Sequence, residues 1–226
     1  MSAMETKMMP KTLPKILANA KLKKLVVSVV IGAIAGFAVS FALMRTIQLG
    51  WFGDLNTSRS IAALAGVMYL LCGAFVGVGL LNPKMGAKFL NVEDAEELQE
   101  QSVMLRNSVF GIAAMGLSLI LLAFAAPAGP VSATVAAVSV VVLMGLSVLT
   151  SRRQLRAMDE LSTSVSRETA AMAFYLTITV GGGWSGAAHL GFVPGPAPLD
   201  WLTIFAALML VAAFWVCGRR GLLTPR

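Results

Sequence analysis

The sequence predicts an all-α integral membrane protein with six transmembrane helices in three hairpins and with both termini on the cytoplasmic side. Of its 226 residues, 57% are hydrophobic and 13% are charged, and the mean hydropathy is +0.79. That is too little polar surface to cover a soluble globular domain. Six apolar stretches approach the length of about 20 residues that a helix needs to cross a bilayer. The Lys and Arg residues are concentrated in alternate segments between these stretches.

The six predicted spans follow one another along the chain, and polar segments separate the hairpins. Prolines mark the turns of the second and third hairpins, AAPAGP at 125–130 and GFVPGPAPLD at 191–200. Proline lacks a backbone N–H and restricts the residue before it, so it ends helices. The spans are 25–44, 60–81, 108–126, 131–150, 169–190 and 201–217, which pair into hairpins over 25–81, 108–150 and 169–217. The other segments are a basic N-terminal segment (1–24), an acidic amphipathic helix (82–107), a charged helix (151–168) and a tail (218–226).

The distribution of cations predicts the orientation of the chain. If the N-terminus is cytoplasmic, 16 of the 18 Lys and Arg residues fall in inner segments, and only Arg45 and Arg59 fall in outer ones. This bias is the positive-inside pattern. Aromatic residues, which favour membrane interfaces, lie near the predicted outer boundaries: Trp51, Phe52, Trp184, Phe192 and Trp201. The net charge of +7 therefore reflects topology, and no nucleic-acid partner is expected.

An acidic stretch, NVEDAEELQE at 91–100, stands out in this basic chain. In the predicted topology this stretch lies on the cytoplasmic side. Asn91 with Asp94 resembles the capped start of a helix that leads into the third span. A metal site is not expected, because no histidine or second acidic helix completes one. The simplest interpretation is a solvated helix face. The functional interpretation is a contact surface, either between this stretch and the basic inner loop or with another protein. Its residues are Glu93, Glu96, Glu97 and Glu100 on the acidic side and Arg152, Arg153 and Arg156 on the basic side.

Small residues at four-residue spacing in the first two spans predict close helix packing, since they let helices approach closely in lipid. They are Gly32, Gly36 and Ser40 in the first span and Gly73 and Gly77 in the second. The contact that they favour is intramolecular packing. Homo-oligomerisation and docking onto a larger membrane protein complex are the alternatives.

The fifth span holds the residues with the most open interpretation. His189, the single histidine, is the one candidate for binding a cofactor, as an axial ligand to a haem or pigment. The simpler interpretation is an interfacial residue close to water, so no cofactor is expected. The glycine run could break the helix and line a cavity, as in transporters, or could serve close packing. The residues of that candidate cavity are Tyr175, Thr179, Gly181, Gly182, Gly183 and Ser185.

No Asp, Glu, Lys or Arg lies at the centre of a predicted span, although ion pathways and proton-coupled carriers commonly place them there. Nucleophile triads, zinc-protease motifs and nucleotide-binding loops are also missing from the sequence. We therefore expect a non-catalytic accessory or scaffold subunit surrounded by membrane lipids. A small transporter or channel for an uncharged or lipophilic solute is the alternative, and a pigment- or haem-associated subunit is a second one.

Two weaker sequence similarities remain. Shifting the chain by 63 residues aligns Glu96, Glu97 and Leu98 with Asp159, Glu160 and Leu161, each before a span, which suggests an internal repeat or a chance match. Residues 152–220, with RRQLRAMDELSTSVSRETAAMAFYLT at 152–177, PLDWLTIF at 198–205 and GRR at 218–220, resemble short two-span bacterial inner-membrane proteins of unknown function. That resemblance implies a bacterial cytoplasmic membrane and carries over no catalytic residue.

Overall fold

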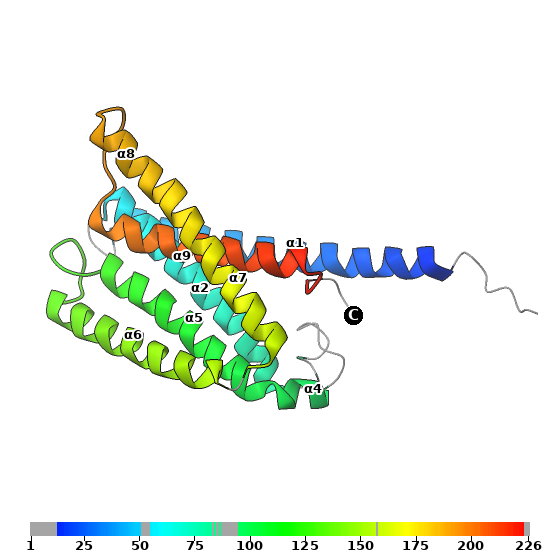
Figure 1. Ribbon diagram of the computed structural model, residues 1–226. Coiled ribbons are helices and arrows are strands. Elements are labelled where there is room, and N and C mark those ends of the chain that lie inside the picture. The colour runs from blue at the N-terminus through cyan, green and yellow to red at the C-terminus, as the bar shows by residue number, and fades with distance from the viewer. Residues whose placement is uncertain are drawn as a thin grey trace, which may run out of the picture.

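The computed structural model describes residues 13–50, 55–82, 84, 86, 95–156 and 158–223, and every element in these ranges is helical apart from one isolated bridge between Ala125 and Val131 (Figure 1). The elements are α1 (Leu13–Gln48), α2 (Thr57–Leu81), α4 (Ala95–Glu100), α5 (Ser102–Ala123), α6 (Ala133–Leu155), α7 (Glu160–Thr177), the π-helical turn η1 (Ile178–Gly182), α8 (Gly183–His189) and α9 (Pro198–Arg219).

Five of these helices are long and apolar enough to cross a membrane: Val29–Gln48 of α1, and α2, α5, α6 and α9 over their whole length. The prediction of an all-helical protein is therefore confirmed for the described residues, and these five helices are compatible with a multi-pass membrane protein. The fifth predicted span, 169–190, is not among the five because the helical path there is divided into α7, η1 and α8. The backbone stays right-handed helical at both junctions, Ile178 and Gly182, and Figure 1 shows one continuous helix running from yellow to orange.

Three helices, α2, α5 and α9, form the core of the bundle, and each contacts the other two. Tyr69 of α2, Leu119 of α5 and Ala206 of α9 meet in one buried cluster. Each core helix carries one peripheral helix: α1 packs chiefly on α2, α6 on α5 and α7 on α9. The N-terminal half of α1 extends beyond the other helices (Figure 1). Each predicted hairpin thus contributes one core helix and one peripheral helix.

The closest approach in the core is the crossing of α2 and α5 at two glycines. A Cβ atom added to Gly66 would lie 2.7 Å from the carbonyl oxygen of Gly116, and one added to Gly116 would lie 2.7 Å from the carbonyl oxygen of Gly66. No side chain fits there without moving a backbone. Absence of side chains at this point is what allows the two helix backbones to touch.

The structure divides the predicted charged helix at 151–168. Helix α6 continues to Leu155, the chain turns, and α7 begins at Glu160. The physical reason is Asp159, whose carboxylate accepts a hydrogen bond of 2.9 Å from the amide of Ser162 and so caps α7. The first part of the segment therefore extends the fourth span, and only the second part leads into the fifth.

The acidic segment predicted at 82–107 is helical where it is described. Helix α4 covers Ala95–Glu100, and the backbone bonds from Gln101 to Glu97 and from Leu105 to Gln101 carry the helical path into α5. Leu98 is buried, whereas Glu96 and Glu100 are exposed, so the helix is amphipathic. Glu93 and the cap expected at Asn91 and Asp94 lie outside the described residues.

Candidate functional site

In the part of the chain that the structure describes, polar interactions between helices gather at the two ends of the bundle, apart from the hydrogen bond from Tyr69 to the carbonyl of Ala206 in the core. At one end, the N-terminus of α2 meets the C-terminus of α5 through Arg59, whose Nη1 donates hydrogen bonds to the carbonyl oxygens of Ala123, at 3.0 Å, and Ala125, at 2.5 Å. These carbonyls end α5 and carry the negative pole of its dipole, so a guanidinium is favourable there. We call this the loop end of the bundle, because the turns before α6 and α9 lie there (Figure 1).

The N-terminus of α9 joins the same end. Ser58 donates a hydrogen bond of 2.5 Å to one carboxylate oxygen of Asp200, and the other oxygen accepts one of 2.6 Å from the amide of Ala197. Asp200 therefore caps its own helix and holds the start of α2 at the same time. The two interactions explain why the three core helices share one boundary at the loop end.

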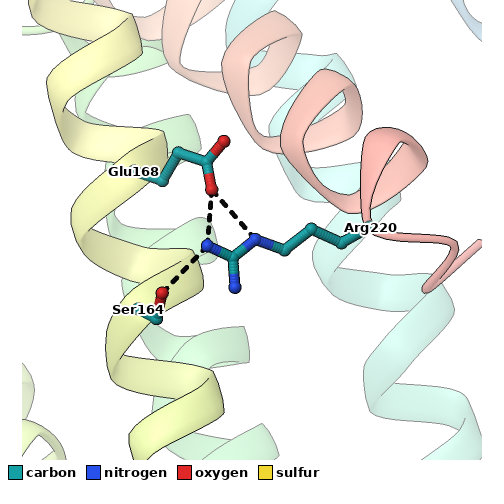
Figure 2. Close-up of polar contacts among 3 residues, drawn as sticks. All are labelled: Ser164, Glu168 and Arg220. Atoms are coloured by element: carbon teal, nitrogen blue, oxygen red, sulfur yellow. Dashed lines mark hydrogen bonds and ion pairs between the residues drawn. The ribbon is translucent and has the colours of Figure 1, made fainter.

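The opposite end, which we call the charged end, joins α7 to α9 by an ion pair. Figure 2 shows Arg220 reaching across from α9: its Nη2 lies 2.6 Å from Oε2 of Glu168, and its Nε donates to the same oxygen at 2.9 Å. Nη2 also donates to Oγ of Ser164 at 2.9 Å. Both charged side chains are about one-third exposed, at 32% and 33%, so solvent weakens the attraction and the pair orients the helices more than it stabilises them.

A cavity of about 440 Å³ opens beside this ion pair, at the start of α7. Its lining is polar apart from one methionine, and Ser164 belongs both to the cavity and to the ion-pair group. The lining residues are Met158, Glu160, Thr163, Ser164 and Arg167. Glu160, Thr163, Ser164 and Arg167 share one face of α7, because residues three, four and seven apart lie on the same side of a helix.

The predicted acidic and basic contact residues all lie at the charged end where they are described. Arg152 and Arg153 occupy the last turn of α6, Arg156 follows it, and all three are exposed. Within the described ranges, none of these arginines forms an ion pair with a carboxylate. Glu97 instead accepts a hydrogen bond of 3.0 Å from the side chain of Gln101. Because Glu93 lies outside the described residues, pairing between the two sets stays a prediction.

The expected helix-packing residues divide between two environments. In α1, Gly32 faces open space and Gly36 meets only the side chain of Met68. Ser40 is half-buried beside them. In α2, Gly73 and Gly77 face α5, where added Cβ atoms would lie 3.3 Å from Ile112 and 3.7 Å from Val109. The pair at the crossing of α2 and α5, Gly66 with Gly116, was missed, although both are small residues within predicted spans.

The glycine run forms the π-helical turn, and its members differ in surroundings. Gly181 is buried, and a Cβ atom there would lie 2.6 Å from the ring of Trp201 in α9. Gly182 and Gly183 are exposed. Tyr175 and Thr179 of the candidate cavity lie on the outer surface, where Tyr175 is 68% exposed.

The residues that follow the glycine run form α8. Ser185 is half-buried, and Trp184 donates a hydrogen bond of 2.8 Å to the carbonyl of Pro194, which ties α8 to the loop before α9. His189 occupies the last turn of α8 and is exposed.

Within the described part of the chain, no three His, Cys, Asp or Glu side chains come close enough together to hold a metal ion. Compared with protein-family models, with curated proteins and with solved structures, the chain gives no match.

Proposed function

We propose that this chain is a six-span protein of the bacterial cytoplasmic membrane, with both termini inside, that acts as a non-catalytic accessory or scaffold subunit. The continuous helix from Glu160 to His189 supports a span at 169–190, which brings the number of spans to six. It is about 45 Å long at 1.5 Å per residue, and the hydrocarbon core is about 30 Å thick. The segments that carry most of the arginines lie together at the charged end of the bundle. This supports the proposed orientation, in which the charged end faces the cytoplasm.

The observation that carries this proposal is the contrast between a closed core and open peripheral faces. The core is filled by residues such as Tyr69, whose hydroxyl donates a 2.8 Å hydrogen bond to the carbonyl of Ala206. Peripheral helices instead expose large apolar side chains, among them Phe37 at 73% and Val141 at 71%. Such faces suit lipid or the helices of a neighbouring protein. A protein with a tightly packed centre and apolar outer faces is built for contact with other helices.

The acidic helix α4 supplies the selective part of that contact. Its exposed carboxylates project from the charged end, and Leu98 fixes the helix against the bundle. We propose that a basic surface of a partner protein binds here, with Glu93, Glu96, Glu97 and Glu100 as the contact residues.

Mild-detergent purification from the native membrane, followed by mass spectrometry, tests this function. The quadruple reversal of the four carboxylates to Lys should abolish co-purification of the partner, and Glu100→Lys alone should weaken it. Glu160→Lys is the matched control, because Glu160 is an exposed carboxylate at the same end on another helix. Co-purification that survives the quadruple variant, or that both single variants weaken equally, contradicts a role for α4.

A second candidate is a small carrier for an uncharged or lipophilic solute, and the π-helical turn η1 favours it. Such turns occur frequently at functional sites, because they leave backbone groups without regular partners. Trp201 occupies the space beside Gly181, so a solute would need that ring to move. Uptake assays in proteoliposomes with Gly181→Ala would test the carrier: transport abolished by the variant supports it, and no transport by the unmodified protein removes it.

A further inference from the structure

The cavity at the start of α7 carries charges of both signs. Its wall includes the carboxylate of Glu160 and the guanidinium of Arg167, with Thr163 and Ser164 between them on the same helix face. Both charged residues belong to the described ranges, and they form no ion pair with each other. Their backbones are about 10 Å apart along the helix, at 1.5 Å per residue. A polar cavity with an anion near one end and a cation near the other suits a ligand that carries both charges.

The end of the cavity at Ser164 and Arg167 offers hydrogen-bond donors to an anion. Oγ of Ser164 accepts the hydrogen bond of 2.9 Å from Nη2 of Arg220, so its own hydroxyl proton can be donated to a ligand (Figure 2). Thr163 adds a second hydroxyl group, and the guanidinium of Arg167 has paired N–H donors that match phosphate oxygens. The volume of about 440 Å³ lies within the range of about 300–1,000 Å³ that is usual for small-molecule sites.

The level of the cavity in the membrane points to the source of a phosphate. In the proposed topology the fifth span begins at residue 169. For a helix along the membrane normal, the backbone of Arg167 then lies about 3 Å outside the hydrocarbon core and that of Ser164 about 8 Å outside it. The headgroup layer on each side is about 5–8 Å thick, so both residues lie at its level. Glu160 lies farther out, about 14 Å from the hydrocarbon core, toward the water.

We infer that this cavity binds the headgroup of a phospholipid that carries a primary ammonium group beyond its phosphate, as phosphatidylethanolamine does. The phosphate lies against Arg167 and Ser164, and the ammonium group points outward to the carboxylate of Glu160. A primary ammonium group donates three hydrogen bonds, whereas a choline group has no N–H to donate and a glycerol headgroup has no positive charge. The inference rests on the proposed membrane topology but not on the proposed protein partner, whose contact residues belong to α4.

Titration of the delipidated full-length protein in detergent with single phospholipids tests the inference, with native mass spectrometry as the readout. Phosphatidylethanolamine should bind about fivefold more tightly than phosphatidylglycerol or phosphatidylcholine, which is the effect of one exposed ion pair. Arg167→Gln should lower the affinity for all three lipids about fivefold, because each of them carries the phosphate. Glu160→Gln should lower the affinity for phosphatidylethanolamine alone, about fivefold, and so abolish the preference.

Arg106→Gln on α5 is the matched control, because Arg106 is an exposed arginine at the same end that does not line the cavity. This variant should leave the affinity for all three lipids unchanged. Equal losses in Arg106→Gln and Arg167→Gln would show a diffuse surface charge and overturn the site. Equal affinities of the unmodified protein for phosphatidylethanolamine and phosphatidylglycerol, or a preference that survives Glu160→Gln, would overturn the pairing with the ammonium group.

Two further measurements separate this inference from its alternatives. Free phosphoethanolamine at millimolar concentration should not displace the lipid; displacement would show a site for a soluble ligand and overturn the assignment to a phospholipid. Glu160→Lys should lose the preference for phosphatidylethanolamine and keep the protein partner, whereas Glu100→Lys should keep the preference and weaken the partner. Failure of the lipid site is therefore distinguishable from failure of the proposed function.

Discussion

Replacement of Gly66 by alanine should destabilise the bundle by separating its two most closely packed helices. The new Cβ atom would lie 2.7 Å from the carbonyl oxygen of Gly116 and 2.8 Å from Cγ1 of Ile120. The isoleucine can rotate, but the backbone oxygen can move only with its helix. Overpacking of this kind costs about 1–3 kcal/mol. The cost should be at the upper end of that range, because a whole helix must shift.

Gly111→Ala on α5 is the matched control, because nothing lies within 4 Å of the position of its Cβ atom. Alanine is about 1 kcal/mol better than glycine inside a helix, so this variant should be neutral or stabilised. Because both variants gain the same helix propensity, they should differ by the overpacking cost alone, about 1–3 kcal/mol. Thermal unfolding in one detergent measures this as a difference of roughly 2–12 °C in Tm, on the scale of soluble proteins of this size. Equal Tm values for the two variants would refute the crossing.

Three further predictions concern single polar groups. Arg59→Gln should lower the free energy of unfolding by at most about 1.5–3 kcal/mol, because two carbonyls lose a charged donor at a half-buried site. Arg45→Gln in exposed α1 should leave the Tm unchanged. Tyr69→Phe should cost about 0.5–1.5 kcal/mol by the same melt, because its hydroxyl bonds a backbone carbonyl of α9, and Tyr175→Phe on the surface should cost nothing measurable. Hydrogen bonds from the side chain and the amide of Ser162 lower the pKa of Asp159. The cap is therefore complete above the unfolded pKa of about 3.9, and it is lost as the pH falls through the lower folded pKa. Amide exchange in the first turn of α7 should show this as a loss of protection at low pH, and the Asp159→Ala variant should show no such pH dependence.

The helices could be predicted from the sequence because hydropathy is a local property. A run of apolar residues must be helical in lipid whatever its neighbours are, so the spans could be placed without knowing how they pack. The boundaries of the helices depend on capping interactions, and the sequence indicates only some of these. Asp159 was visible as an acidic residue, but its role as a cap ends one helical segment and begins another, which composition alone does not reveal.

The helix contacts were less accessible, since they depend on which face of each helix meets a neighbour. Gly32 and Gly36 fit the small-residue spacing as well as Gly73 and Gly77 do, yet the first pair lies on the periphery and the second faces α5. A motif describes one helix, whereas a contact needs two helices in register.

The polar interactions at the bundle ends were out of reach for the same reason. Arg220 and Glu168 are 52 residues apart, and Ser58 and Asp200 are 142 residues apart. Many charged and polar residues in the terminal segments could have formed such pairs. Only the packing of α7 on α9 and of α2 against α9 selects these partners.

The places of α5 and α7 in the bundle also bear on the similarity between the two charged segments. A duplication that kept its structure would put both helices in equivalent positions, but α5 belongs to the core and α7 packs on its outside. The aligned residues differ in role as well: Asp159 caps α7, whereas Glu96 lies inside α4. The match is therefore better explained by a shared local requirement. Each segment must supply polar residues to a helix that emerges from the membrane, and acidic residues near a helix N-terminus meet that need.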